Sequence, residues 1–206
     1  ETVVIDINAV VNGVEKDGVQ KKTVTLTDLN DPPGVTLTLG VNSLSETIGT
    51  TSLTTVTATL DAVSGLPVTV VLDRTGTAIL GVDYTLAASI TIPAGSMSKV
   101  VTLAVVTDAI DELPETVIID MGTVTNGTEK TPQTATVTIE DDDDPPAVTL
   151  SMVNPILNES APGNSSLVKA TLSGPSGLSV TVTLITSGTA SSTDYTLNNT
   201  IVVKAG

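Results

Sequence analysis

The sequence predicts an all-β fold, made of tandem seven-stranded antiparallel β-sandwiches with an immunoglobulin-like topology. Three observations predict it. Apolar residues alternate with polar ones at a period of two, turn residues separate the alternating runs, and no segment has a convincing helical period. Seven short runs within about 100 residues are typical of a β-sandwich. The chain has no Cys, His, Trp or Phe, so its core must be aliphatic.

The middle of the chain supplies the seven strands in order. Thr occupies many of the outward positions, where a β-branched side chain suits a pleated surface. Turns are expected at Ser64-Gly65, Arg74-Thr75-Gly76, Pro93-Ala94-Gly95 and Asn126-Gly127. The strands are expected at residues 35–39, 55–60, 68–72, 90–92, 100–106, 116–120 and 134–139.

An internal repeat organises the chain into domains. The stretch TVTLTDLNDPPGVTLTL, which begins at Thr23, returns as TVTIEDDDDPPAVTLSM from Thr136, a spacing of 113 residues. This is the size of one globular domain. We therefore expect the C-terminal part of a first repeat at 1–31, a complete repeat at 32–144 and the N-terminal part of a third repeat at 145–206. Asp-Pro-Pro marks both junctions, and the strand-like start at Glu1 suggests a piece of something longer.

Charge and composition exclude several classes of function. The net charge is −15, with eight basic residues among 206, whereas nucleic acids and anionic membranes require a positive surface. No apolar run approaches the roughly 18 residues of a membrane helix, so direct membrane insertion is not expected. Without His or Cys the chain lacks the commonest general base and the thiolate nucleophile, and we expect no enzyme.

Acidic residues gather at the ends of the predicted strands. IEDDDDPP (Ile139–Pro146) closes the last strand, TDAIDELPE (Thr107–Glu115) bridges two others, and Glu46 and Asp83 lie in further loops. Loops of a sandwich collect at its two ends, so these four segments could meet at one of them. Ca²⁺ takes six to eight hard oxygen ligands, whereas softer metals would find no His or Cys. The alternative is that the acidic run is a solvated linker.

With these motifs the chain resembles the Calx-beta family, found in sodium–calcium exchangers and large extracellular adhesion proteins. The resemblance covers all three pieces. It is carried by SGTA…DYT, the ITIPAG hairpin, the acidic D…E..E loop and the terminal TVTIxDDD. It implies a seven-stranded antiparallel sandwich that binds several Ca²⁺ ions where the last strand exits. The implied metal ligands are Glu46, Asp83, Asp108, Glu112, Glu115, Asp141, Asp142 and Asp143.

The chain departs from the family pattern in places. Thr107 stands where strong binders have the first of two paired aspartates, which is expected to lower the number of ions by one. Asp111 and Asp144 fall outside the pattern. The third piece offers Glu159 and Asp194 at equivalent positions. The first piece keeps Asp28, but Leu29 and Asn30 replace two of its three terminal aspartates, so that junction is expected to bind Ca²⁺ weakly or not at all.

These features favour a calcium-binding structural or adhesive repeat of a large secreted or cell-surface protein, of bacterial composition. Calcium would rigidify the end of the domain and the junction between repeats, so the expected partners are calcium, neighbouring repeats of the same chain, and other surface proteins or glycans. Two alternatives remain. One is a module that recognises a protein or glycan with incidental calcium. The other is a structural subunit of an extracellular filament or surface layer.

Overall fold

The chain forms two compact units. The computed structural model describes residues 1–16, 18, 20–26, 31–160 and 163–206. The first unit comprises Glu1–Pro32 and the second Pro33–Gly206. The described residues contain strands and turns but no α-helix, which confirms the predicted all-β class. None of them forms a helix of the length and hydropathy that crossing a bilayer requires.

The first unit is a two-stranded antiparallel hairpin. Its strands are β1 (Thr2–Ile5) and β2 (Lys22–Thr25), and every residue in both is exposed. Thr2 lies opposite Thr25. In the complete repeat, Thr116 lies opposite Thr138 in the same way. The first piece therefore pairs in the register that the internal repeat assigns to it.

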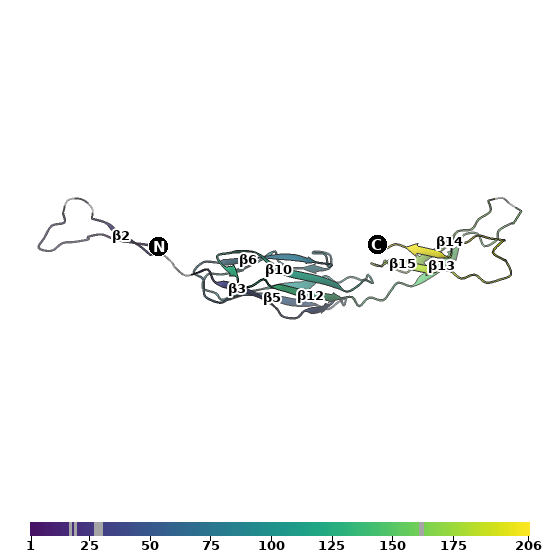
Figure 1. Ribbon diagram of the computed structural model, residues 1–206, viewed down its shortest axis with the longest axis horizontal. Helices are drawn as coiled ribbons and strands as arrows, with labels where there is room; N and C mark the ends of the chain where they lie inside the picture. Colours follow the sequence, from purple (N-terminus) through teal and green to yellow (C-terminus); the bar gives the residue numbers. More distant parts are fainter. Residues whose placement is uncertain (17, 19, 27–30, 161–162) are drawn as a thin grey trace. The chain divides into compact units, whose positions relative to one another are not determined.

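The second unit contains two five-stranded sheets that face one another (Figure 1). Each sheet is named here by its strands in spatial order. The first sheet is β4 (Ser43–Ser45), β12 (Thr134–Glu140), β10 (Glu115–Thr125), β6 (Val68–Gly76) and β8 (Ser89–Ile92). The second sheet is β11 (Thr128–Glu129), β3 (Gly34–Leu39), β5 (Leu53–Leu60), β9 (Ser98–Val105) and β7 (Tyr84–Thr85).

All seven predicted strands are present, as β3, β5, β6, β8, β9, β10 and β12, and their pairings are antiparallel. The turn expected at Arg74-Thr75-Gly76 is wrong, because β6 continues through Gly76 and these three residues pair with Val117–Ile119 of β10. Two short pairings differ: β4 runs parallel to β12, and β11 runs parallel to β3. The first parallel pair arises because the chain leaves one sheet after β3 and continues in the other as β4. The Thr54 hydroxyl fixes this crossing, since it exchanges hydrogen bonds with the N–H and the C=O of Val41, each at 2.8 Å.

The core is the aliphatic layer between the two sheets, as the composition predicts. On β6, Val68, Val70 and Leu72 are buried while the residues between them are not, which is the alternation expected of a half-buried strand. Ile119 of β10 and Leu103 of β9 are also fully buried, and they come from opposite sheets. Burial of these side chains supplies the main stabilising free energy of the sandwich.

The last part of the second unit forms two further hairpins. In one, β13 (Val148–Met152) pairs with β14 (Val168–Leu172), and in the other β15 (Val180–Thr183) pairs with β16 (Thr200–Val203). Val148 lies opposite Leu172 as Val35 lies opposite Leu60 in the complete repeat. The side chains of these four strands are half-buried or exposed. The division at 31/32 and 144/145 stays a prediction for the boundaries of the repeats.

Candidate metal centre

Four acidic segments meet at one end of the complete sandwich. The Glu46 N–H, just after β4, donates to the Glu140 carbonyl at the end of β12 (3.0 Å). The Val106 N–H, at the start of the loop between β9 and β10, donates to the Asp83 carbonyl (2.9 Å). These two backbone hydrogen bonds join the four segments in pairs, and the charges of Asp83, Asp108 and Asp141 all act on Glu46, which places both pairs at the same tip.

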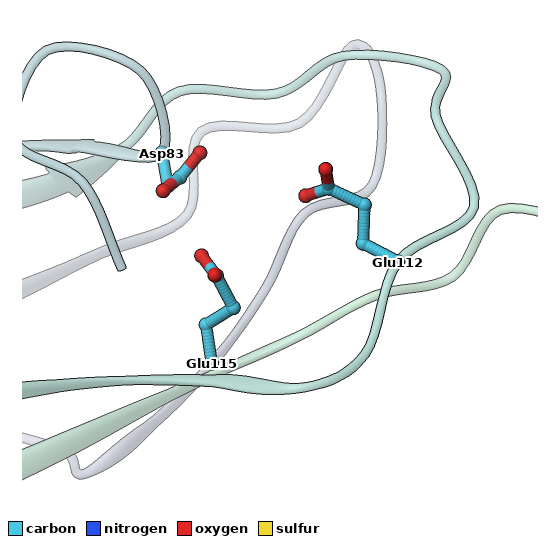
Figure 2. Close-up of side chains that lie close together, drawn as sticks. All are labelled: Asp83, Glu112 and Glu115. Atoms are coloured by element: carbon cyan, nitrogen blue, oxygen red, sulfur yellow. The ribbon is translucent and has the colours of Figure 1, made fainter. Parts of the chain in front are cut away.

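Three carboxylates point toward one another at this tip (Figure 2). Asp83 precedes β7, Glu115 is the first residue of β10, and Glu112 belongs to the loop between β9 and β10. One oxygen atom from each lies within 4.8 Å of the others. At such distances ionised carboxylates repel one another by roughly 4 kcal/mol per pair at an effective dielectric constant near 20. The cluster is therefore unfavourable unless a proton or a cation neutralises it.

A tight turn holds Asp83 in place. The Ile79 N–H donates to the Asp83 Oδ2 (2.5 Å), and the Asp83 N–H donates to the Ile79 carbonyl (2.9 Å). Only 6% of Asp83 is exposed. Its carboxylate is thus positioned by backbone before any ion arrives.

Burial and neighbouring negative charges act on Glu46. Burial, followed by the charges of Asp108, Glu112, Asp141 and Asp83, raises the pKa of Glu46 to about 7. Glu46 is itself 6% exposed. The residues that raise its pKa come from the three other acidic segments, so this side chain is electrostatically coupled to all of them.

The other two glutamates behave in the same way. Burial raises the pKa of Glu115 to about 7, with further contributions from a hydrogen bond to Asp83 and from the charges of Asp83 and Glu112. Burial also raises the pKa of Glu112, aided by the charges of Asp108, Asp83 and Asp141. Glu46 and Glu115 are consequently poised to hold protons near neutral pH that a divalent cation would displace.

The aspartates after β12 complete the tip. The Oδ1 atom of Asp141 is buried and has no hydrogen-bond partner in the described structure. Burial raises the pKa of Asp143, as do the charges of Asp141, Asp142, Asp108 and Asp111, in that order. Asp142 is exposed and Asp143 half-buried. A buried carboxylate oxygen without a donor fits a cation ligand.

No basic side chain neutralises this tip in the described part of the chain. The two ion pairs there are Lys130–Asp61 (3.4 Å) and Lys21–Asp6 (4.0 Å), which involve none of the tip carboxylates. No cation contributes to the pKa shifts of Glu46, Glu112, Glu115 or Asp143. The donor set is oxygen only, which fits Ca²⁺ and not the metals that prefer nitrogen or sulfur.

The eight residues that the sequence singled out differ in how they take part. Asp83, Glu112 and Glu115 form the close cluster. The charges of Asp108 and Asp141 act on Glu112, and Glu46 is in turn subject to the charges of Asp83, Asp108, Glu112 and Asp141. Asp108 also accepts a hydrogen bond from the Ile110 N–H (2.9 Å), which shapes the loop. Asp142 and Asp143 lie farther along the exit from β12. Their roles as metal ligands stay predictions.

The acidic residues outside the eight have different surroundings. Asp111 accepts a hydrogen bond from the Ser176 hydroxyl (3.5 Å). Ser176 lies in the third piece, and the acidic pattern of the complete repeat does not indicate this partner. Asp144 is exposed. In the third piece Glu159 and Asp194 are exposed and line one cavity of about 830 Å³. Asp28, Leu29 and Asn30, on which the weak first junction was predicted, lie outside the described residues.

Solved structures of Calx domains are similar to this chain, whereas no protein-family model and no curated protein matches it. The apo form of the Calx CBD1 domain is 23% identical to this chain, with a TM-score of 0.42. The match covers 53% of this chain and 99% of the CBD1 chain. CBD12 from CALX1.2 is 22% identical with a TM-score of 0.41, and the match covers 49% of this chain.

The calcium binding domain CBD12 of CALX1.1 is 17% identical with a TM-score of 0.41, over 68% of this chain and 74% of its own. This chain spans 42% of the CBD12 structure from CALX1.2. These are Calx domains, the family that the sequence resembles.

Proposed function

We propose that the complete repeat binds Ca²⁺ at its acidic tip. The observation that supports this most is the cluster of Asp83, Glu112 and Glu115, whose oxygens approach within 4.8 Å and which form no ion pair with any basic group among the described residues. Glu46, Asp108 and Asp141 surround the cluster and would hold the ion with it. The ion would supply positive charge and would be held by oxygens alone.

The work of the protein's own residues is to hold like charges together before the ion binds. The turn at Ile79–Asp83 fixes one carboxylate, and the start of β10 fixes Glu115. The burial that raises the pKa values of Glu46 and Glu115 also excludes water, which strengthens their attraction to a dication. Binding would release the protons that these two glutamates hold near neutral pH.

We further propose that the chain is a structural or adhesive repeat of a large secreted or cell-surface protein. Calcium would order the loop between β9 and β10 and the exit from β12, which leads through Asp144-Pro145-Pro146 toward the third repeat. Weak sites suffice outside the cell, where dissociation constants on the order of 10⁻⁴ to 10⁻³ M are useful. Supporting this role are the internal repeat and the position of the acidic tip at the junction.

Isothermal titration calorimetry of the 206-residue chain with CaCl₂, after removal of metal by a chelator, tests the proposal. We expect saturable binding whose measured heat varies with the ionisation enthalpy of the buffer, because binding releases protons. Thermal melting with Ca²⁺ and with EGTA supplies a second readout, because an ion at 100 times its dissociation constant adds about 2.7 kcal/mol per independent site. A flat titration together with superimposable melts would leave the acidic run as a solvated linker.

A further inference from the structure

A turn of the third repeat packs on the acidic loop of the complete repeat. Ser176 forms a parallel β-bridge with Asp111, and the Gly177 N–H donates to the Asp111 carbonyl at 3.0 Å. The Ser176 hydroxyl also reaches the Asp111 carboxylate (3.5 Å), and Ser176 is only 2% exposed. The acidic loop thus has a protein partner as well as its own carboxylates.

Gly177 lies close against the side chain of Glu112. A Cβ atom at position 177 would lie 2.6 Å from both Cγ and Oε1 of Glu112, well inside van der Waals distance. Glu112 is also a member of the three-carboxylate cluster. Any larger residue at position 177 would have to displace either the turn or the Glu112 side chain.

The complete repeat contains the same turn. The Ser176 carbonyl accepts from the Gly206 N–H (3.0 Å), as the Ser64 carbonyl accepts from the Gly95 N–H (2.9 Å). Each serine hydroxyl also accepts from the amide two residues later, at 3.2 Å for Leu178 and 3.1 Å for Leu66. The two turns are therefore built alike from equivalent positions of the repeat.

Only their surroundings differ. A Cβ atom at Gly65 would meet nothing within 4 Å, and Leu66 is 59% exposed, whereas Leu178 is half-buried. The turn at residues 64–66 thus has the same shape as the turn at residues 176–178, which contacts the acidic loop. In contrast, the space beside Gly65 is free. Residues 1–31 contain no equivalent of the loop 107–114, because Glu1 matches Glu115 in the repeat.

We propose that the Ser64–Leu66 turn is a docking surface for the acidic loop of a preceding copy of this repeat, a loop of the type at residues 107–114. The partner's Asp-Glu pair would meet the turn as Asp111 and Glu112 meet Ser176 and Gly177. Both interfaces depend on a glycine and on backbone hydrogen bonds. The docking is argued from these contacts and does not require an ion in the acidic tip.

Amide hydrogen exchange at residues 65 and 177 tests this in two proteins. One is the chain 1–206, and the other is the same chain with residues 1–31 replaced by a second copy of 32–144. We expect residue 177 to be protected in both. Residue 65 should gain about tenfold protection only in the longer protein, which is the order implied by one hydrogen bond. Equal exchange at residue 65 in the two proteins would overturn the proposal.

Paired valine variants provide the control for steric fit. Gly65→Val should leave the chain 1–206 unchanged because space is free there, but should abolish the gain of protection in the longer protein. Gly177→Val should remove protection at residue 177 in both. If Gly65→Val had no effect in the longer protein, or if residue 177 of the unmodified chain exchanged freely, the docking would be refuted. Calorimetry on the same samples reports calcium binding separately, so either conclusion can fail alone.

Discussion

Glu46 and Asp83 in the complete repeat have exact counterparts in the third piece, Glu159 and Asp194, yet their surroundings differ. The first pair is buried, whereas the second pair is exposed. Burial and nearby carboxylates raise the pKa of Glu46 to about 7, whereas hydrogen bonds from Ser191 lower the pKa of Asp194. The same residues in the same motif therefore form a charged cluster in one place and solvated side chains in the other.

The difference comes from strands that lie far away in the sequence. In the complete repeat, β10 and the loop before it contribute Glu112 and Glu115, and β12 leads into Asp141. The four strands of the third piece pair as two hairpins and supply no such residues. A carboxylate motif thus becomes a candidate cation site only when the second half of the sandwich surrounds it.

The largest effect on stability should come from a substitution in the core of the complete repeat, compared with one at an exposed site of the third piece. Ile119→Ala removes a fully buried side chain from β10 and should lower the free energy of unfolding by about 2–5 kcal/mol. Ile185→Ala, at a side chain that is 95% exposed in the third piece, should change it by less than about 0.5 kcal/mol. Urea unfolding measures both. Equal losses would mean that the two regions are packed alike.

Removing a carboxylate from each region should separate their roles in calcium binding. Asp83→Asn is expected to weaken Ca²⁺ binding by roughly 10- to 100-fold, because it removes a fixed negative charge from the cluster. Asp194→Asn is the matched control and should leave the affinity of the complete repeat unchanged. Calorimetric titration gives both values. Wild-type affinity in Asp83→Asn would place the binding site elsewhere.

The pH dependence of stability should report the cluster in calcium-free buffer. The pKa values of Glu46 and Glu115 rise from 4.5 to about 7 on folding, so between these pH values the folded state holds protons that the unfolded state has released. The free energy of unfolding should therefore fall as pH rises from about 4.5 to about 7, and then level off.

Saturating Ca²⁺ should abolish this fall, because it stabilises the ionised glutamates. Urea unfolding at a series of pH values, with and without the ion, is the measurement. Stability that rises with pH over the same window in calcium-free buffer would contradict the raised pKa values.

The smallest effect is expected for Glu46→Gln, which should be favourable without calcium and unfavourable with it. Without calcium at pH 8, Glu46→Gln should stabilise the chain by about 1 kcal/mol, because it removes a buried negative charge that its neighbours repel. With calcium the same change should weaken binding. Glu159→Gln should do neither, since Glu159 is exposed. Thermal melting in EGTA and in CaCl₂ measures the pair, and destabilisation by Glu46→Gln in EGTA would argue against repulsion at the tip.

The sequence by itself determined the seven main strands of the complete repeat, their order along the chain and the internal repeat, but not the short strands β4, β7 and β11. The main strands depend on local chemistry, because a period of two dictates which side of a strand is apolar and turn residues mark many of the strand ends. Arg74-Thr75-Gly76 is an exception, since pairing with β10 keeps these residues in β6. The period of two was enough to predict a half-buried strand at residues 68–72, and Val68, Val70 and Leu72 are the residues that the structure buries there. The acidic segments were equally visible, since they follow or precede strands and contain no other ligand type.

Only the tertiary structure decided which carboxylates meet and how strongly they interact. The approach of Asp83, Glu112 and Glu115 depends on loops joined by the sandwich, and the raised pKa of Glu46 depends on burial that no linear pattern reveals. The switch of the chain into the first sheet at β4 and the contact between Asp111 and Ser176 were also unforeseen. Both link residues through space, where packing and backbone hydrogen bonds, and not periodicity, determine the arrangement.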